Sequence, residues 1–172
     1  APVQYSQETV PLRRVIGRIL RQDVVAERDL PPFDRVTMDG IAIARASWER
    51  GQREFAIQAI QAAGEAAITL DRPADTCIQV MTGTPLAHGT DCIVPVEQLT
   101  LHDGIARIEG QAAPEPMQYI HRRASDNHAG DTLLHAGRRL RMQDIPVMAA
   151  VGLADVCVSA CPSIAIVSTG DE

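Results

Sequence analysis

A proline-containing stretch that ends in a tight turn, residues 30–40, limits the folding of this chain more than any other run. Its two adjacent prolines hold their own φ at about −65° and favour an extended backbone at the preceding Leu30. Asp39-Gly40 is typical of a turn that leads into a strand, and the apolar run 41–44 follows it. We therefore expect a carboxylate at the mouth of a β-strand. On spacing alone, an ordinary structural turn is the simpler interpretation of Asp39.

The composition indicates a folded chain with an aliphatic core. Of the 172 residues, 45% are hydrophobic and only 3% are aromatic, so Val, Ile, Leu and Ala must fill the interior. This length fits one domain or two small ones. The formal net charge of −6 argues against general affinity for nucleic acid or an anionic membrane. No apolar run approaches the ~20 residues of a membrane span, and we expect a cytoplasmic protein.

Hydrophobic spacing predicts two helices and a series of short strands. Apolar residues recur at helical intervals from Leu12 to Leu20, which predicts a helix at 7–20. A second helix is predicted at 142–151, where Gly152 closes it. The stretch 58–67 fits either a strand, a turn and another strand or a partly helical segment. Strands bounded by Gly, Pro or Asp are predicted at 23–26, 41–46, 55–60, 77–81, 92–96, 104–108, 118–123, 153–158 and 164–167.

This order of elements predicts an α+β fold built from a discontinuous domain and an insertion. A small all-β, barrel-like domain, residues 37–121, is expected between the two parts of an α/β domain. Those two parts are residues 1–36 and 122–160, and each needs the other for a stable core. Residues 161–172 are expected to begin a further α/β domain, which is truncated here.

The metal-ligating residue types show no spacing that defines a metal centre. None of the histidines pairs at i, i+4 on a clear helix, and the four cysteines lack the spacing of a zinc site. We expect the cysteines to be free thiols. Exposed loop positions are the expectation for the five histidines, which are His88, His102, His121, His128 and His135.

Four strings of the chain, in the same order, resemble the molybdopterin molybdenumtransferases of the MoeA/gephyrin family. The first is the run 31–42, which is similar to the family segment PPFDNSAMDGYA. In that family the aspartate of the Met-Asp-Gly turn is an active-site residue, and the resemblance places it at Asp39. Arg35-Val36 replace Asn-Ser, and Ile41 replaces Tyr. The resemblance therefore turns an ordinary-looking turn into a candidate site.

The second and third strings add a hydroxyl and another carboxylate. The run 81–87 resembles the family's MTGAPVP, whose threonine lies at the active site and corresponds to Thr82. A Thr-Gly turn at a strand end can also present its hydroxyl and neighbouring N–H groups to an anion. The run 122–131 is similar to the family stretch RxxGEDI, and Asp126 matches its aspartate. Ala124-Ser125 stand where the family has Gly-Glu.

The fourth string closes the chain. Residues 168–172 match the start of the family string STGDEL, which opens the molybdopterin-binding α/β domain. The resemblance makes Ser168, Thr169 and Glu172 candidate substrate-binding residues. A strand that ends in Ser-Thr-Gly presents hydroxyls and amides where α/β sheets commonly bind phosphate-bearing ligands.

The resemblance implies an N-terminal part of an enzyme of molybdenum cofactor biosynthesis. The family reaction inserts molybdate into adenylylated molybdopterin and releases AMP. Asp39, Thr82 and Asp126 are the implied catalytic residues, with Thr82 on the substrate and both aspartates on Mg²⁺. A homodimer is implied, to which the helix at 7–20 and the segment 142–160 contribute. The implied partner is an adenylyltransferase that supplies the substrate, and the fragment alone is expected to be inactive.

Two other interpretations compete with this one. The departures at Arg35-Val36 and Ala124-Ser125 fit a non-catalytic dimerisation or scaffolding module that kept the fold and lost the chemistry. The arginine clusters at 13–21, 122–123 and 138–141 fit a domain that binds an anionic partner, although such clusters usually form solvated faces.

Overall fold

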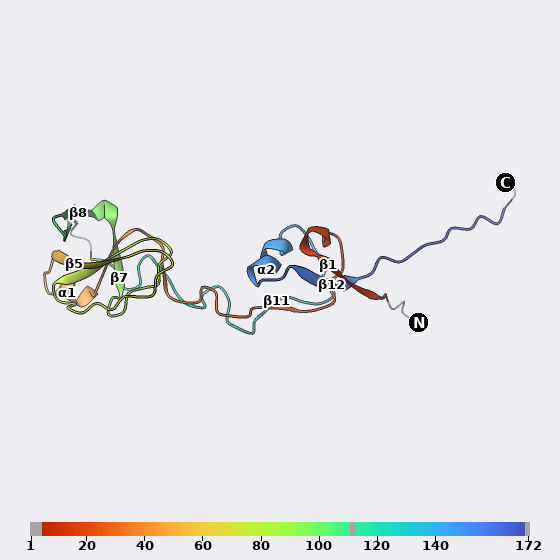
Figure 1. Ribbon diagram of the computed structural model, residues 1–172, viewed down its shortest axis with the longest axis horizontal. Helices are drawn as coiled ribbons and strands as arrows, with labels where there is room; N and C mark the ends of the chain where they lie inside the picture. Colours follow the sequence, from red (N-terminus) through yellow and green to blue (C-terminus); the bar gives the residue numbers. More distant parts are fainter. Residues whose placement is uncertain (1–4, 111–112, 171–172) are drawn as a thin grey trace. The chain divides into compact units, whose positions relative to one another are not determined.

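The computed structural model describes residues 5–110 and 113–170 of the chain, and Figure 1 shows its strands and helices. The chain forms two compact units. One unit combines residues 1–27 with 129–172, and the other is the continuous segment 28–128. The first unit is therefore made from both ends of the chain. The expected limits at 37 and 121 fall inside the second unit.

A six-stranded mixed sheet forms the body of the second unit, in the order β7-β4-β6-β5-β9-β8. All neighbours are antiparallel except β5 and β6, which run parallel. In Figure 1, β5, β7 and β8 lie together with α1 (Arg45–Glu49). The strands are β4 (Gly40–Ile43), β5 (Glu54–Gln61), β6 (Thr76–Val80), β7 (Cys92–Pro95), β8 (Leu99–His102) and β9 (Ile105–Ile108).

The central strands of this sheet are buried on both faces. On β4, Ile41 and Ile43 join one core with Phe55, whereas Ala42 between them joins a second core with Ile78. Successive side chains of a strand point to opposite faces, so one strand supplies both cores. This explains why the sequence of these strands is continuously apolar rather than alternating.

Short elements extend this unit beyond the sheet. The two-residue strands β3 (Arg35–Val36) and β10 (Ile120–His121) pair antiparallel. A 3-10 turn, η2 (Val96–Gln98), links β7 to β8. In the described residues β7 and β8 form the two open edges of the sheet, so its hydrogen bonds do not close a barrel. The sheet is therefore open rather than a closed barrel, and its central strands are covered on both faces.

The first unit is held together by strands from opposite ends of the chain. β1 (Gln7–Pro11) pairs antiparallel with β12 (Asp155–Ser159), which Figure 1 shows side by side. β2 (Val24–Val25) pairs with β11 (Thr132–Leu134). Its core contains nine buried residues: Val10, Val15, Leu20, Val24, Leu134, Leu140, Met148, Val156 and Val158.

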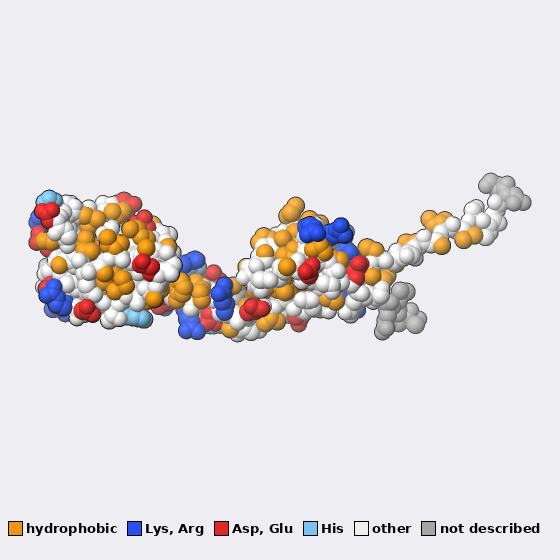
Figure 2. Space-filling view, in the orientation of Figure 1, with side chains coloured by type: hydrophobic (Ala, Val, Ile, Leu, Met, Phe, Trp, Pro, Cys, Tyr) orange, Lys and Arg blue, Asp and Glu red, His pale blue; other side chains and the backbone are white. Residues whose placement is uncertain are grey.

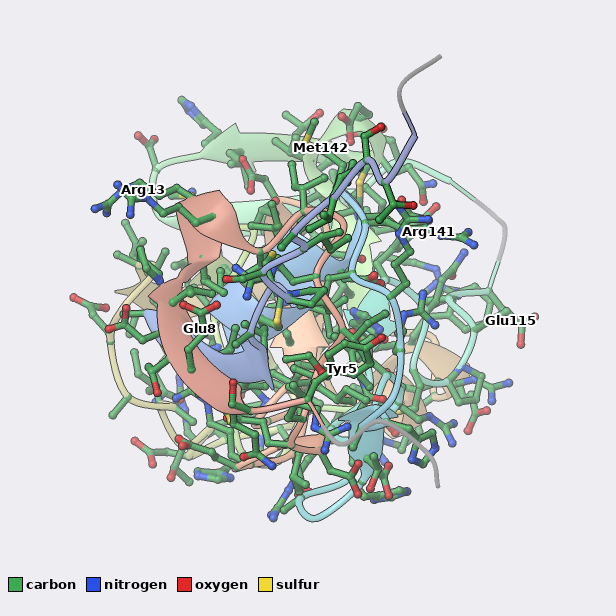
Figure 3. All side chains as sticks on the ribbon, turned by 90° about the vertical axis from the view of Figure 1, so that its right-hand side faces the viewer. Tyr5, Glu8, Arg13, Glu115, Arg141 and Met142 are labelled. Atoms are coloured by element: carbon green, nitrogen blue, oxygen red, sulfur yellow. The ribbon has the colours of Figure 1, made fainter. Side chains whose placement is uncertain are left out.

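Two further elements complete the first unit. The 3-10 turn η1 (Leu12–Arg14) contacts the helix α2 (Asp144–Ala150). Figure 3 shows Glu8 on β1 and Arg13 on η1, with the Arg13 side chain directed away from the ribbon. Charged side chains lie between apolar ones on the visible face of this unit (Figure 2). None of the helices in the described ranges has the length and hydropathy needed to cross a membrane.

The helix predicted at 7–20 is wrong. The segment instead forms β1 and η1, because Gln7–Pro11 finds a strand partner far away in the sequence. Gly17 has φ +80°, which is incompatible with a continuing α-helix. Ile16 is also exposed rather than packed on a helical face. Long-range pairing therefore overrides the local helical spacing.

The strand predicted at 164–167 is also wrong. Residues 160–170 contain no helix or strand, and Ile164, Ile166 and Val167 are exposed. An apolar strand needs neighbours in a sheet, and no described strand pairs with this segment.

Most other predicted elements have a counterpart in the structure. The strands β3, β8 and β11 were not predicted, and the segment 118–123 is a strand only at β10. The ambiguous stretch 58–67 is strand up to Gln61 and irregular after it. The predictions at 23–26, 41–46, 55–60, 77–81, 92–96, 104–108, 142–151 and 153–158 correspond to β2, β4, β5, β6, β7, β9, α2 and β12.

Candidate functional site

The antiparallel pairing of β4 with β6 brings Asp39 and Thr82 together. Gly40 is the pairing partner of Val80, so the residue before β4 lies beside the turn that follows β6. The Thr82 hydroxyl donates a hydrogen bond to Asp39 Oδ1 at 2.7 Å, and the Thr82 backbone N–H donates to the same oxygen at 2.6 Å. Both side chains are exposed. Thr82 thus anchors the carboxylate of Asp39, although the two residues lie 43 positions apart in the sequence.

Glycines on both sides of this pair are required by its geometry. A Cβ atom on Gly40 would lie 2.0 Å from the carbonyl oxygen of Val94, so β4 and β7 pass each other too closely for any side chain there. Gly83 has φ +94°, a conformation that other residues rarely adopt. Gly40 thus permits the close pairing of β4 with β7 directly after Asp39, and Gly83 permits the turn directly after Thr82.

Thr82 lowers the pKa of Asp39. The hydrogen bond from the Thr82 hydroxyl is the largest cause, and the bond from its backbone N–H adds to it, because both stabilise the ionised carboxylate. A small opposing effect comes from desolvation. The Asp39 carboxylate is therefore charged at neutral pH, and no described residue is bonded to its second oxygen, Oδ2.

Asp126 belongs to a separate hydrogen-bonded group. Its Oδ1 lies 2.9 Å from Nε2 of His121, and Nδ1 of that ring lies 3.1 Å from a terminal guanidinium nitrogen of Arg35. Arg35 and His121 are direct cross-strand neighbours on β3 and β10. The backbone N–H of Asp126 donates to the Leu30 carbonyl at 2.9 Å, which ties the loop to the proline-containing stretch.

The two groups flank the same short strand, β3. On one edge, Val36 donates to the Thr84 carbonyl and accepts from the Gly83 N–H, each at 2.9 Å. On the other edge, Thr37 donates to the Tyr119 carbonyl at 2.9 Å. The loop that carries Thr82 and the strand that carries His121 are therefore neighbours of β3 on opposite sides.

The loop around Asp126 contains a strained backbone position. Ala124 has φ +59°, the left-handed conformation that glycine adopts most readily. The Ala124 N–H donates to the Pro31 carbonyl at 3.0 Å, which helps to hold the turn. Alanine thus adopts a glycine-like backbone at the position where the sequence comparison placed a family glycine.

A pocket of about 350 Å³ lies against the segment that follows Thr82. Its apolar wall includes Phe33, Pro85 and Leu86, and its polar rim includes His88 and Arg123. Small-molecule sites are commonly apolar cavities of this size with a few polar groups.

The other predicted site residues are not part of these groups. Ser168 and Thr169 lie in the irregular segment 160–170 with exposed side chains, and Glu172 lies outside the described residues. The structure therefore joins Asp39 to Thr82, and Asp126 to His121.

His121 and Arg35 are the residues that sequence reasoning missed. His121 was expected in an exposed loop, but it lies on β10 and its side chain is only 33% exposed. No spacing in the sequence indicates that residues 35, 121 and 126 meet, because the pairing of β3 with β10 brings them together.

The described residues fit Mg²⁺ only in part. In residues 5–110 and 113–170, no three His, Cys, Asp or Glu side chains gather closely enough to hold a metal ion. Mg²⁺ commonly uses one or two carboxylates together with waters and substrate oxygens. Asp39 Oδ2 can supply one such ligand. A magnesium site here would need most of its ligands from the substrate and water.

The buried cysteines are unsuited to nucleophilic chemistry. Burial raises the pKa of Cys77 and of Cys92 to about 12, so both thiols stay protonated at neutral pH. Charge from Asp91 adds to the effect at Cys92.

Fold and site together define a class of chain. The sheet-rich second unit carries exposed, anchored carboxylates and is inserted in sequence between the two parts of the first unit. The family described as "MoeA N-terminal region (domain I and II)" matches residues 1–152. The chain belongs to this family, which confirms the resemblance inferred from the four strings.

Curated relatives and solved structures agree with this membership. The molybdopterin molybdenumtransferase of Synechocystis is 34% identical over 169 residues, covering 98% of this chain and 43% of the relative. That of Haemophilus influenzae is 29% identical over 171 residues, covering 99% and 42%. The crystal structure of a molybdopterin biosynthesis MoeA protein from Pyrococcus horikoshii matches with a TM-score of 0.78 at 30% identity, covering 90% of this chain and 41% of that one. The chain spans less than half the length of these proteins.

Proposed function

We propose that this chain is the N-terminal part of a molybdopterin molybdenumtransferase and that it presents Asp39 and Thr82 to the substrate. The reaction would insert molybdate into adenylylated molybdopterin and release AMP. The names of the Synechocystis and Haemophilus relatives support this activity. Since these relatives are more than twice as long as the matched region, the rest of the active site is expected from other parts of such a protein.

The observation that best supports this proposal is the pair of hydrogen bonds from Thr82 to Asp39 Oδ1. It holds the carboxylate ionised and in one orientation, with Oδ2 available to a ligand. An exposed carboxylate that is anchored in this way can order a metal-bound phosphate or oxyanion without a large entropic cost.

Each side chain has a distinct role in this proposal. Asp39 Oδ2 would contribute a ligand to Mg²⁺ at the substrate, and Asp126 would contribute a second carboxylate from the other edge of β3. Mg²⁺ would supply charge neutralisation at the phosphate oxygens. Thr82 keeps Asp39 ionised and holds the turn at the end of β6. Ser168, Thr169 and Glu172 remain candidates for binding the substrate.

The proposed assembly is a homodimer supplied by an adenylyltransferase. The dimer contact would involve the segments 7–20 and 142–160, which both belong to the first unit. Sedimentation of the chain at several concentrations tests the dimer directly.

The activity is tested in a completed protein, defined as residues 1–172 joined to the part of the Synechocystis transferase beyond its matched segment. AMP release from adenylylated molybdopterin is measured with molybdate and Mg²⁺. We expect Asp39→Asn to lower kcat/KM by about 100-fold, because the variant loses the charged ligand of the proposed Mg²⁺ and its charge stabilisation of the transition state. Asp71→Asn, at an exposed carboxylate of the same unit, serves as the matched control.

Full activity of a folded Asp39→Asn protein would contradict the catalytic role. That result would favour the alternative of a scaffolding module, in which the two units keep their fold and no reaction depends on Asp39. The strained backbone of Ala124, which stands where the family has a glycine, favours this alternative.

A further inference from the structure

Three side chains of the second unit form a continuous hydrogen-bonded line. Arg35 contacts Nδ1 of His121 at 3.1 Å, and Nε2 of His121 contacts Oδ1 of Asp126 at 2.9 Å. The first two are cross-strand neighbours, and cross-strand side chains lie about 5 Å apart. The hydrogen-bonded chain therefore begins at Arg35 and His121 on the paired strands and ends at the exposed carboxylate of Asp126 in the loop.

The chemistry of arginine determines where the imidazole proton lies. A guanidinium group donates hydrogen bonds and accepts none. Nδ1 of His121 must therefore accept the bond from Arg35, which leaves the ring proton on Nε2. The Nε2–H group faces Asp126 Oδ1 and donates to it. The carboxylate of Asp126 accepts only, so it favours the same Nε2–H tautomer, and Arg35 reinforces this choice from the other side of the ring.

The bond from His121 uses only one oxygen of Asp126. The described residues include no partner for Oδ2, and the Asp126 side chain is 52% exposed. Asp39 shows the same arrangement on the other edge of β3, with Oδ1 anchored and Oδ2 unbonded among the described residues. Each edge therefore presents one oriented carboxylate oxygen.

We propose that Arg35 and His121 are positioning residues for Asp126: the Arg35–His121 pair fixes the imidazole tautomer and thereby the orientation of the carboxylate that meets the ligand. Neither side chain touches the substrate in this arrangement. The inference rests on the proposed function for the identity of the ligand, while the tautomer and the hydrogen bonds are properties of the chain itself.

The tautomer is tested first, without any activity. In ¹⁵N-labelled residues 1–172 at about pH 8, where an ordinary histidine is neutral, long-range proton–nitrogen correlation distinguishes the two ring tautomers. His121 is assigned by its disappearance in His121→Gln. We expect the Nε2–H tautomer in the wild type and in Asp126→Leu, and a mixture of tautomers when Arg35→Leu is added to Asp126→Leu. The Nδ1–H tautomer in the wild type, or no difference between Asp126→Leu and the double variant, would overturn the proposal.

The effect on Asp126 is tested in the completed protein. His121→Leu removes the donor, and we expect kcat/KM to fall about 10- to 100-fold, the range typical when a partner that orients a ligating side chain is lost. His121→Gln keeps an N–H donor of similar reach and should restore activity to within about threefold of wild type. Arg28→Leu removes an exposed arginine of the same unit that lies outside the four strings, and it should leave activity unchanged.

A third variant separates failure of this inference from failure of the proposed function. If Asp126→Asn abolishes activity but His121→Leu and His121→Gln both keep it, positioning is overturned and the proposed function stands. If Asp126→Asn keeps full activity although the Nε2–H tautomer is observed, the assignment of Asp126 to the active site fails. Loss in His121→Leu with recovery in His121→Gln supports the proposal, because a general loss of folding would not be restored by one N–H group.

Discussion

At the scale of single residues, three aspartates of this chain differ in how their oxygens are used. Asp39 and Asp126 are exposed, and each is anchored through Oδ1. Asp144 is buried at 2% exposure, and both of its oxygens accept bonds, from Arg138 and from the Arg141 backbone. Both oxygens of Asp144 therefore serve the fold, whereas Asp39 and Asp126 each present one exposed oxygen to a ligand.

The first prediction concerns the pKa of Asp39. Thr82→Val removes the hydroxyl donor, which is the largest cause of the lowered pKa. We expect the Asp39 pKa to rise towards its ordinary value of 3.8 while staying below it, because the backbone N–H still donates. A ¹³C NMR titration of the Asp39 carboxyl measures the change. An unaltered pKa in Thr82→Val would show that the hydroxyl bond does not form in solution.

The second prediction concerns the strained turn at Ala124. Because φ is +59°, Ala124→Gly relieves backbone strain of about 1–2 kcal/mol and adds a smaller entropic cost in the unfolded chain. We expect a net gain of about 0.5–1 kcal/mol in the free energy of unfolding, measured by urea denaturation. Ala66→Gly, in an exposed loop with ordinary φ, is the control and should be neutral or destabilising. Equal effects of the two substitutions would contradict the assigned backbone strain.

At the scale of elements, the first turn of α2 depends on its buried carboxylate. Asp144 begins the helix and binds the guanidinium of Arg138 at 2.9 Å. Burial raises the pKa of Asp144, but the hydrogen bonds and charges of Arg138 and Arg141 outweigh this effect and leave the pKa below its ordinary value. The pair joins α2 to the segment after β11, and so contributes to the first unit.

The third prediction follows from the sign of this shift. A lowered folded-state pKa stabilises the protein above the ordinary value of 3.8, and this contribution is lost as the pH falls through the lower folded value. We expect Asp144→Asn to cost about 1–2 kcal/mol at pH 7, because it removes charge-assisted hydrogen bonds while the 44% exposed Arg138 can be hydrated again. The cost should shrink at low pH. Urea denaturation between pH 7 and 3 measures both, with Asp155→Asn as an exposed control.

A pH-independent cost of Asp144→Asn would contradict the ionic origin of the stabilisation and indicate a packing effect alone. Asp155→Asn should show no comparable loss at any pH, since Asp155 is exposed on β12.

At the scale of the whole molecule, the two units differ in how they are connected. The second unit is one continuous segment with two cores of its own and a six-stranded sheet. The first unit takes its core from both ends of the chain, since Val10 packs with Val156 and Val158. Folding of the first unit therefore needs residues that lie more than 100 positions apart.

The fourth prediction is that residues 28–128 fold alone. All strands of the large sheet and the partners of Asp39 and Asp126 lie within this segment. We expect the isolated segment to give a dispersed amide NMR spectrum that overlays the corresponding signals of residues 1–172. Residues 1–27 alone should be unfolded, because β1 and β2 lose the partners β12 and β11. A poorly dispersed amide spectrum for residues 28–128 would show that its two cores are insufficient for this segment to fold alone.

Much of the candidate site could be predicted because it depends on short motifs. Asp39-Gly40 and Thr82-Gly83 each carry a turn and a polar side chain in adjacent positions, so sequence alone indicated both. The bonds from Thr82 to Asp39 required β4 to pair with β6. The role of His121 could not be predicted, since it depends on a two-residue strand pair that no local pattern indicates.

The local sequence was sufficient to predict the short apolar strands of the sheet, the helix α2 and the glycine turns. These elements follow from the spacing of apolar residues and from backbone preference. Long-range pairing alone decided the rest. It turned the helical-looking segment 7–20 into a strand and a turn, left 164–167 without strand structure, and brought Arg35, His121 and Asp126 into one line. Hydrogen bonds between distant strands depend on partners that a local pattern does not contain, and for that reason only the folded chain reveals them.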